Sequence, residues 1–160
     1  MRILMVCLGN ICRSPLAEGI LRHKISKRGL NWQTDSAGTA GWHQDTPPHE
    51  LSCKVAKLNG FDISDQRSRP LVVEDFDRFD FLFVMDRSNY SNVKQLAGAR
   101  FDPNQVKMIL NEIFPGENRE VPDPWSYNID AYHSVFEMLD QACEQLIENI
   151  LSAQKNNKPY

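Results

Sequence analysis

Short apolar runs alternate with stretches of helical periodicity along this chain of 160 residues. Strands are predicted at residues 2–6, 80–85 and 106–110, with a weaker strand near residues 32–36. Strands that alternate with helices predict an α/β fold, a parallel sheet covered by helices on both faces. Ligands of such sheets bind beyond the carboxyl ends of the strands. The loop after the first strand is therefore the first place to look for a functional site.

Helices are expected between and after these strands. The first is predicted to take Ser14 as its cap and Gly29 as its stop. Further helices are expected over residues 48–59, 88–96 and 131–151, the last with apolar residues on one side at helical spacing.

The chain length suits one domain, expected over residues 1–153, with residues 154–160 as a frayed tail. No internal repeat or low-complexity tract interrupts it. The polar segment 111–128 contains three prolines and is long for a connection in a compact domain, which favours a functional loop.

The charge balance excludes some classes of function. Eighteen basic and 21 acidic residues give a net charge of −3, so the chain lacks the positive field that nucleic-acid binding recruits. Four cysteines are too few for a disulfide framework. With no visible leader segment and no run of ~18 apolar residues, we expect a cytoplasmic protein with free thiols and no membrane partner.

The loop after the first strand reads CLGNICRSP over residues 7–15. A loop that opens a helix can point successive backbone N–H groups inward, where the positive end of the helix dipole also favours an anion. Gly9 and Asn10 tolerate the positive φ that so tight a loop needs. Arg13 can give two parallel N–H bonds to a phosphoryl group. The segment therefore predicts a phosphate-binding loop.

Cys7 lies at the start of this loop, where the dipole, the backbone donors and Arg13 favour its thiolate, with Ser14 as a further donor. A thiolate that faces a bound phosphate is a nucleophile. Cys7 could instead be one more buried strand residue, since free cysteine is often buried, but the spacing to Arg13 favours the nucleophile. A zinc site at Cys7 and Cys12 is disfavoured because no matching pair of ligands follows nearby.

The string CLGNICRSP resembles the active-site signature of the low-molecular-weight protein tyrosine phosphatases at every fixed position. Residues 35–39, 85–89 and 123–125, with Arg69, also fall where related segments fall in that family. The resemblance covers Arg2 to about residue 151. It implies a three-layer fold with a four-stranded parallel sheet flanked by helices. It also implies hydrolysis of phosphotyrosine and small aryl phosphates through a phosphocysteine, with neither cofactor nor metal.

The resemblance also implies roles for single residues. Cys7 and Arg13 would be catalytic, with Asp123 as the general acid that later activates water. Trp42 and Trp125 would be the flat walls of the phosphotyrosine pocket. Leu8, Gly9, Asn10, Ile11, Cys12 and Ser14 would bind substrate, while Ser36 and Asp86, and Asn10 as well, would support the loop geometry.

Two positions depart from the family pattern. Relatives often have two adjacent aromatic residues after Asp-Pro, but here Ser126 separates Trp125 from Tyr127. Gln66 stands where many relatives have a histidine that supports the loop asparagine. The remaining cysteines and the histidines are expected to be core or surface residues: Cys53, Cys143, His23, His43, His49 and His133.

Three other functions remain open. An arsenate reductase needs two further cysteines, and none occurs between Cys53 and Cys143. An arginine phosphatase of the same family has a threonine at the position of Ile11. A non-catalytic phosphate-binding module would be expected to lack Cys7 or Asp123. The favoured interpretation is a phosphatase of tyrosine-phosphorylated proteins, acting as a monomer or weak dimer.

Overall fold

A four-stranded parallel sheet forms the centre of the computed structural model, which describes residues 1–160. Its strands are β1 (Arg2–Cys7), β2 (Gln33–Gly38), β3 (Phe81–Val84) and β4 (Val106–Met108). They lie in the order β2-β1-β3-β4, so β1 is a central strand. The expected parallel sheet is confirmed, and Cys7 occupies the carboxyl end of β1.

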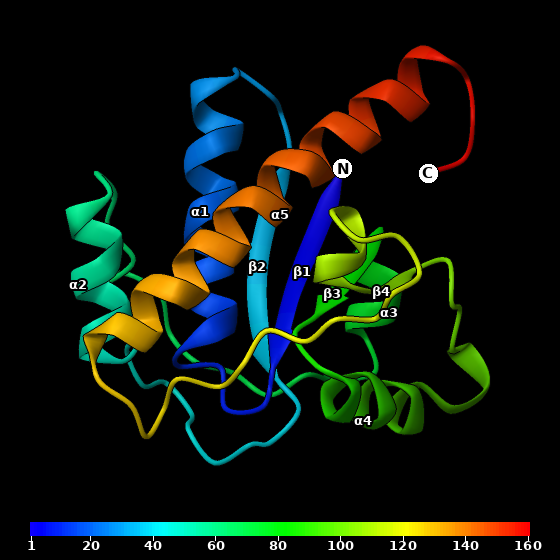
Figure 1. Cartoon of the computed structure of the whole chain (residues 1–160). Helices are drawn as coiled ribbons and strands as arrows, with labels where there is room; N and C mark the ends of the chain where they lie inside the picture. The colour runs from blue at the N-terminus through cyan, green and yellow to red at the C-terminus, as the bar shows by residue number, and fades with distance from the viewer.

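Helices cover both faces of the sheet (Figure 1). One layer contains α1 (Arg13–Lys27) and α5 (Ile129–Lys155), with α2 (Glu50–Leu58) beside them. The other contains α3 (Asp75–Arg78) and α4 (Arg87–Ala97). Two short 3₁₀ helices, η1 (Gly98–Arg100) and η2 (Ile109–Glu112), flank β4 in the sequence. No helix is both long enough and apolar enough to cross a membrane.

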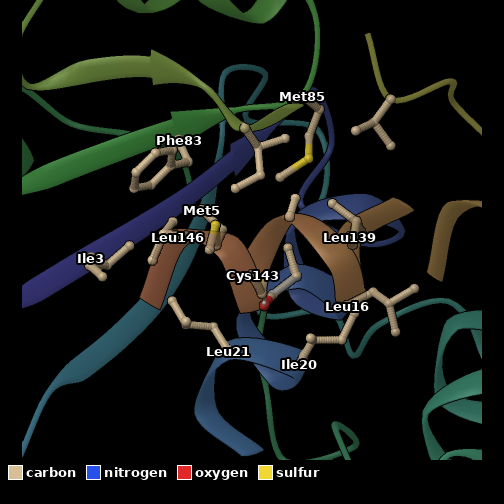
Figure 2. Packing of buried hydrophobic residues seen from close by; sticks show 14 of the residues in the cluster. Ile3, Met5, Leu16, Ile20, Leu21, Phe83, Met85, Leu139, Cys143 and Leu146 are labelled. Atoms are coloured by element: carbon tan, nitrogen blue, oxygen red, sulfur yellow. Dashed lines mark hydrogen bonds between the residues drawn. The ribbon is translucent and has the colours of Figure 1, made fainter. Parts of the chain in front are cut away.

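Side chains of β1 alternate between two hydrophobic clusters. Ile3 and Met5 pack with α1 and α5, whereas Leu4 and Val6 pack with α3 and α4. Full burial of one aliphatic side chain contributes about 1.5–3 kcal/mol, so this two-sided core holds β1 and the loop that follows it. Figure 2 shows the α1–α5 side, with these residues labelled: Ile3, Met5, Leu16, Ile20, Leu21, Phe83, Met85, Leu139, Cys143 and Leu146.

The first helix begins earlier than expected. Cys12, rather than Ser14, occupies the N-cap position, and it makes no side-chain cap bond. Ser14 lies inside the helix, and its hydroxyl contacts Cys7 and Asn10 instead. The prediction of a Ser14 cap was wrong because a tertiary contact takes up the hydroxyl group.

Two other elements have boundaries that differ from expectation. The apolar run 106–110 divides into β4 and η2, because Ile109 and Leu110 turn toward α5 to join its cluster; a short apolar run does not distinguish a strand from a buried helical turn. The last helix continues to Lys155, into the segment expected to be frayed. Beyond it, the Tyr160 ring packs against Phe81 with a centroid separation of 4.8 Å.

Candidate active site

The loop between β1 and α1 curls around the Cys7 sulfur. The backbone N–H of Asn10 donates to Cys7 Sγ over 3.3 Å, and Ser14 Oγ lies 3.1 Å from the same sulfur. Asn10 has a φ of 56°, whereas Gly9 is not in the left-handed region. The tight turn therefore depends on Asn10 alone, and the expectation of a positive φ at Gly9 was wrong.

The Asn10 side chain holds this turn together. Its Nδ2 donates to Ser14 Oγ over 2.8 Å and to Ser36 Oγ over 2.9 Å. Its Oδ1 accepts from the backbone N–H of Arg69 over 2.9 Å. A left-handed conformation costs a residue with a side chain roughly 1–2 kcal/mol, and these three bonds offset that cost.

Asn10 and Ser14 are almost completely buried and do not line the pocket. Their side chains lie behind the loop and support its geometry, while substrate binding by these two residues stays a prediction. Ser36, on β2, accepts a hydrogen bond from Asn10 Nδ2; its supporting role stays a prediction. Gly38 allows β2 to approach the loop, because a Cβ there would lie 2.8 Å from the Leu8 carbonyl oxygen.

Arg13 projects from the start of α1 into a cluster of acceptors. Its Nη1 donates to Asp86 Oδ2 over 2.7 Å and to the Val121 carbonyl over 3.0 Å, and its Nη2 donates to Asp123 Oδ2 over 3.1 Å. Burial opposes the charge, but Cys7 and the two aspartates outweigh it and raise the pKa of Arg13. The guanidinium is therefore permanently charged and fixed in direction beside the sulfur.

Asp123 lies on the long segment between η2 and α5. The backbone N–H of Val121 donates to the Met85 carbonyl over 2.8 Å, which attaches this segment to the end of β3. Asp123 Oδ1 accepts from the backbone N–H of Trp125 over 3.2 Å, and the carboxylate is 44% exposed. The segment 111–128, which the sequence predicts to be a functional loop, thus carries a carboxylate that faces the cysteine loop.

A pocket of about 390 Å³ opens above the sulfur. Trp42 and Trp125, exposed by 74% and 52%, stand at its mouth. A wider hollow of about 710 Å³ lies at the opposite, amino-terminal ends of β1 and β2 and contains none of these residues. The pocket above the sulfur is lined by Cys7, Leu8, Gly9, Ile11, Cys12, Arg13, Trp42, His43, Asp123, Trp125 and Ser126.

His43 is a pocket residue that sequence reasoning placed among the surface histidines. The ring centroids of His43 and Trp125 lie 6.0 Å apart, and His43 lines the pocket. Tyr127 is 68% exposed and does not line the pocket. His43 is thus the third ring in the lining of the pocket, together with the two tryptophans. Its position next to Trp42 was the only signal available in the sequence.

The other cysteines have different environments. Cys12 Sγ lies 3.4 Å from the Tyr132 hydroxyl, and burial raises the pKa of Cys12 to about 12 despite that bond. Cys143 is fully buried in the α1–α5 cluster, as expected, and Cys53 is half-buried outside the pocket. Cys7 is thus the pocket cysteine whose sulfur accepts a backbone N–H from the loop.

Gln66 does not replace the histidine of relatives as a support for Asn10. Its Nε2 donates to the Pro15 carbonyl over 3.1 Å, and its Oε1 has no hydrogen-bond partner. The loop asparagine is held instead by Ser14, Ser36 and the Arg69 backbone.

No group of three or more His, Cys, Asp or Glu side chains is arranged to hold a metal ion. The pocket combines a thiol, a guanidinium and a carboxylate at the carboxyl end of a parallel sheet. Groups of these three kinds can supply the nucleophile, the anion clamp and the proton donor for cleavage of a phosphate ester.

Comparison with known proteins assigns the family. The family model described as "Low molecular weight phosphotyrosine protein phosphatase" matches residues 2–157, and the chain belongs to this family of phosphoric monoester hydrolases. A relative named low molecular weight protein-tyrosine-phosphatase YfkJ, from Bacillus subtilis, is 35% identical over 150 residues. That alignment covers 92% of this chain and 94% of the relative.

Solved structures show the same fold. A protein tyrosine phosphatase from Entamoeba histolytica superposes with a TM-score of 0.86 at 34% identity, covering 96% of this chain and 99% of that one. A Drosophila arginine phosphatase superposes with a TM-score of 0.86 at 29% identity, covering 94% and 98%. Solved structures with this fold thus include proteins named for two different substrate classes.

Proposed function

We propose that this chain removes phosphate from phosphotyrosine in proteins and from small aryl phosphates, through a phosphocysteine on Cys7. The observation that carries the proposal is the convergence of Cys7, Arg13 and Asp123 at the base of a pocket with two tryptophans at its mouth. Flat aromatic walls suit a phenyl ring, and the loop N–H groups with Arg13 suit its phosphate.

In the first step, the Cys7 sulfur attacks phosphorus and the bond to the phenolic oxygen breaks. Asp123, protonated at this stage, gives its proton to that oxygen, so the leaving group departs as a neutral phenol. Arg13 and the loop N–H groups bind the equatorial oxygens, where they stabilise the charge of the transition state. The Arg13–Asp123 bond of 3.1 Å keeps the acid beside the site.

In the second step, Asp123 takes a proton from a water molecule whose oxygen attacks the phosphocysteine. The sulfur–phosphorus bond breaks, inorganic phosphate leaves, and the thiolate is restored. The Asn10 N–H and Ser14 hydroxyl, which lie within 3.3 Å and 3.1 Å of the sulfur, support the thiolate as the leaving group of this step.

The test is turnover of an aryl phosphate by wild type, Cys7→Ser and the control Cys53→Ser. Cys53 lies outside the pocket, so its variant should keep wild-type turnover, whereas Cys7→Ser should lose it. Equal turnover by all three proteins would exclude the phosphocysteine route.

The second candidate is an arginine phosphatase, favoured by the structural likeness to the Drosophila enzyme. Ile11 lines the pocket and is apolar, which suits an aryl group better than the cationic guanidino group of phosphoarginine. One such contact changes specificity by roughly 10–200-fold. We expect Ile11→Thr to shift the ratio of kcat/KM values toward phosphoarginine peptides. A wild type that prefers phosphoarginine would reverse the assignment.

Two further alternatives fit the site less well. An arsenate reductase would need additional cysteines near the nucleophile, but Cys53 and Cys143 do not line the pocket. A phosphate-binding module without activity would not need Asp123 in the position where it faces the leaving group.

We further propose that the protein forms one phosphatase domain, acts in a reducing cytoplasm as a monomer or weak dimer, and uses neither metal nor cofactor.

A further inference from the structure

Glu18 is a buried carboxyl group that the steps above do not use. It lies on α1, is 6% exposed, and its Oε2 accepts from Ser36 Oγ over 2.7 Å. Ser36 Oγ accepts from Asn10 Nδ2, which also donates to Ser14 Oγ, 3.1 Å from the Cys7 sulfur. A continuous chain of hydrogen bonds therefore connects Glu18 with the nucleophile.

The Asn10 amide sets the direction of this chain. Its Nδ2 can only donate, so both serine oxygens must accept from it. The Ser36 proton is then free to point at Glu18, and the Ser14 proton at the Cys7 sulfur. The amide cannot be reversed, because its Oδ1 accepts from the Arg69 backbone N–H over 2.9 Å.

We propose that Glu18 is a positioning residue: its ionised carboxylate holds the Ser36 proton, which keeps Asn10 and Ser14 oriented to support the Cys7 thiolate. A protonated Glu18 is a neutral and therefore weaker acceptor, so the Ser36 proton would be held less firmly. Asn10 would be held less firmly, and with it the left-handed turn of the loop. The predicted effect of Glu18 on turnover rests on the proposed function. The hydrogen-bond chain from Glu18 to Cys7 does not depend on it.

The surroundings of Glu18 place its change of charge near neutral pH. Burial raises the pKa of Glu18 to about 7, against the lowering effect of the Ser36 hydroxyl. Asp35 on β2 and Asp65 after α2 raise it further, while Arg22 lowers it. Arg22 lies 3.8 Å from Glu18 Oε1 but makes its shorter bonds with Asp65. Glu18, at the end of the hydrogen-bond chain, should therefore change its protonation state within the physiological range of pH.

The direct test follows the Asn10 side-chain NH₂ resonance by ¹⁵N NMR without substrate, assigned by its loss in Asn10→Ala. It should titrate with a midpoint near pH 7 in wild type. Glu18→Gln keeps an oxygen acceptor but cannot ionise, so its resonance should not move in this range. Asp65→Asn, which removes a nearby carboxylate outside the chain, should keep the titration.

Turnover gives a second measurement. The ratio of kcat for wild type to kcat for Glu18→Gln should rise as pH passes through 7. Glu18→Leu removes the acceptor, and the loss of one hydrogen bond predicts a kcat about two- to tenfold lower at pH 8.

An Asn10 resonance that does not titrate in wild type, or titrates equally in Glu18→Gln, would overturn the proposal even if Glu18→Leu fails to fold. Absence of aryl phosphate turnover in wild type would instead count against the proposed function, and the NMR measurement would still stand.

Discussion

Arg13 Nη2 donates to Asp123 Oδ2 over 3.1 Å, which joins two groups that lie 110 positions apart in the sequence. The same guanidinium donates to Asp86 through Nη1. The anion-binding cation thus also positions the proposed proton donor. A phosphate that binds Arg13 enters beside that donor, so binding and proton transfer depend on one side chain.

Asp123→Asn should slow turnover according to the leaving group. General acid catalysis contributes typically 10²–10⁴-fold, and a poor leaving group such as tyrosine needs the proton most. We expect losses of about that size in kcat/KM for phosphotyrosine peptides and much smaller losses for aryl phosphates with acidic phenols, because kcat/KM reports the first step, in which Asp123 is the acid. A linear free-energy plot of kcat/KM against the pKa of the phenol measures the difference. A uniform loss across the series would mean that Asp123 is structural.

Alkylation by iodoacetamide should select Cys7. Burial raises the pKa of Cys12 to about 12 and also raises the pKa values of Cys53 and Cys143, which keeps these three as unreactive thiols at pH 6. We expect peptide mapping to find the label at Cys7 and phosphate or vanadate to block it. Slow labelling of all four cysteines without protection would contradict the assignment.

Asn10→Gly and Asn10→Ala form a matched pair. Both lose the three side-chain bonds of Asn10, but only alanine resists its φ of 56°. We expect the alanine variant to be less stable than the glycine variant by about 1 kcal/mol, as measured by denaturant unfolding. Both should show reduced kcat, because the loop loses its support. Equal stability would show that the turn relaxes when the side chain is removed.

Glu18→Gln should change how stability depends on pH. Because the folded chain raises the pKa of Glu18 from 4.5 to about 7, the native state holds the proton more tightly than the unfolded chain. The resulting stability is present below pH 4.5 and is lost as pH rises to about 7, an effect of about 3 kcal/mol at most.

Denaturant unfolding of wild type and Glu18→Gln at pH 5 and pH 8 tests this prediction. The free energy of unfolding should fall between these two values more steeply for wild type than for the variant. Parallel pH dependences would mean that Glu18 has an ordinary pKa in the folded state.

The sequence by itself determined the fold class and the core of the site. Alternating apolar and amphipathic segments depend on local periodicity, so β1, α1 and the parallel sheet could be predicted from it. Cys7 and Arg13 lie six positions apart on one loop, and their proximity follows from chain geometry. Asp123 is remote in the sequence and could be selected only through family resemblance.

The tertiary structure decided which side chains meet across the fold. The chain from Glu18 through Ser36 to Asn10 joins α1, β2 and the cysteine loop, and no local pattern encodes that contact. The place of His43 in the pocket lining also depends on packing, because Trp125, the ring beside it, belongs to a segment distant in the sequence. Likewise, Ser14 does not cap the helix, because its hydroxyl contacts Cys7 and Asn10 instead. Local periodicity predicts elements, but the partner of a polar group depends on how those elements pack.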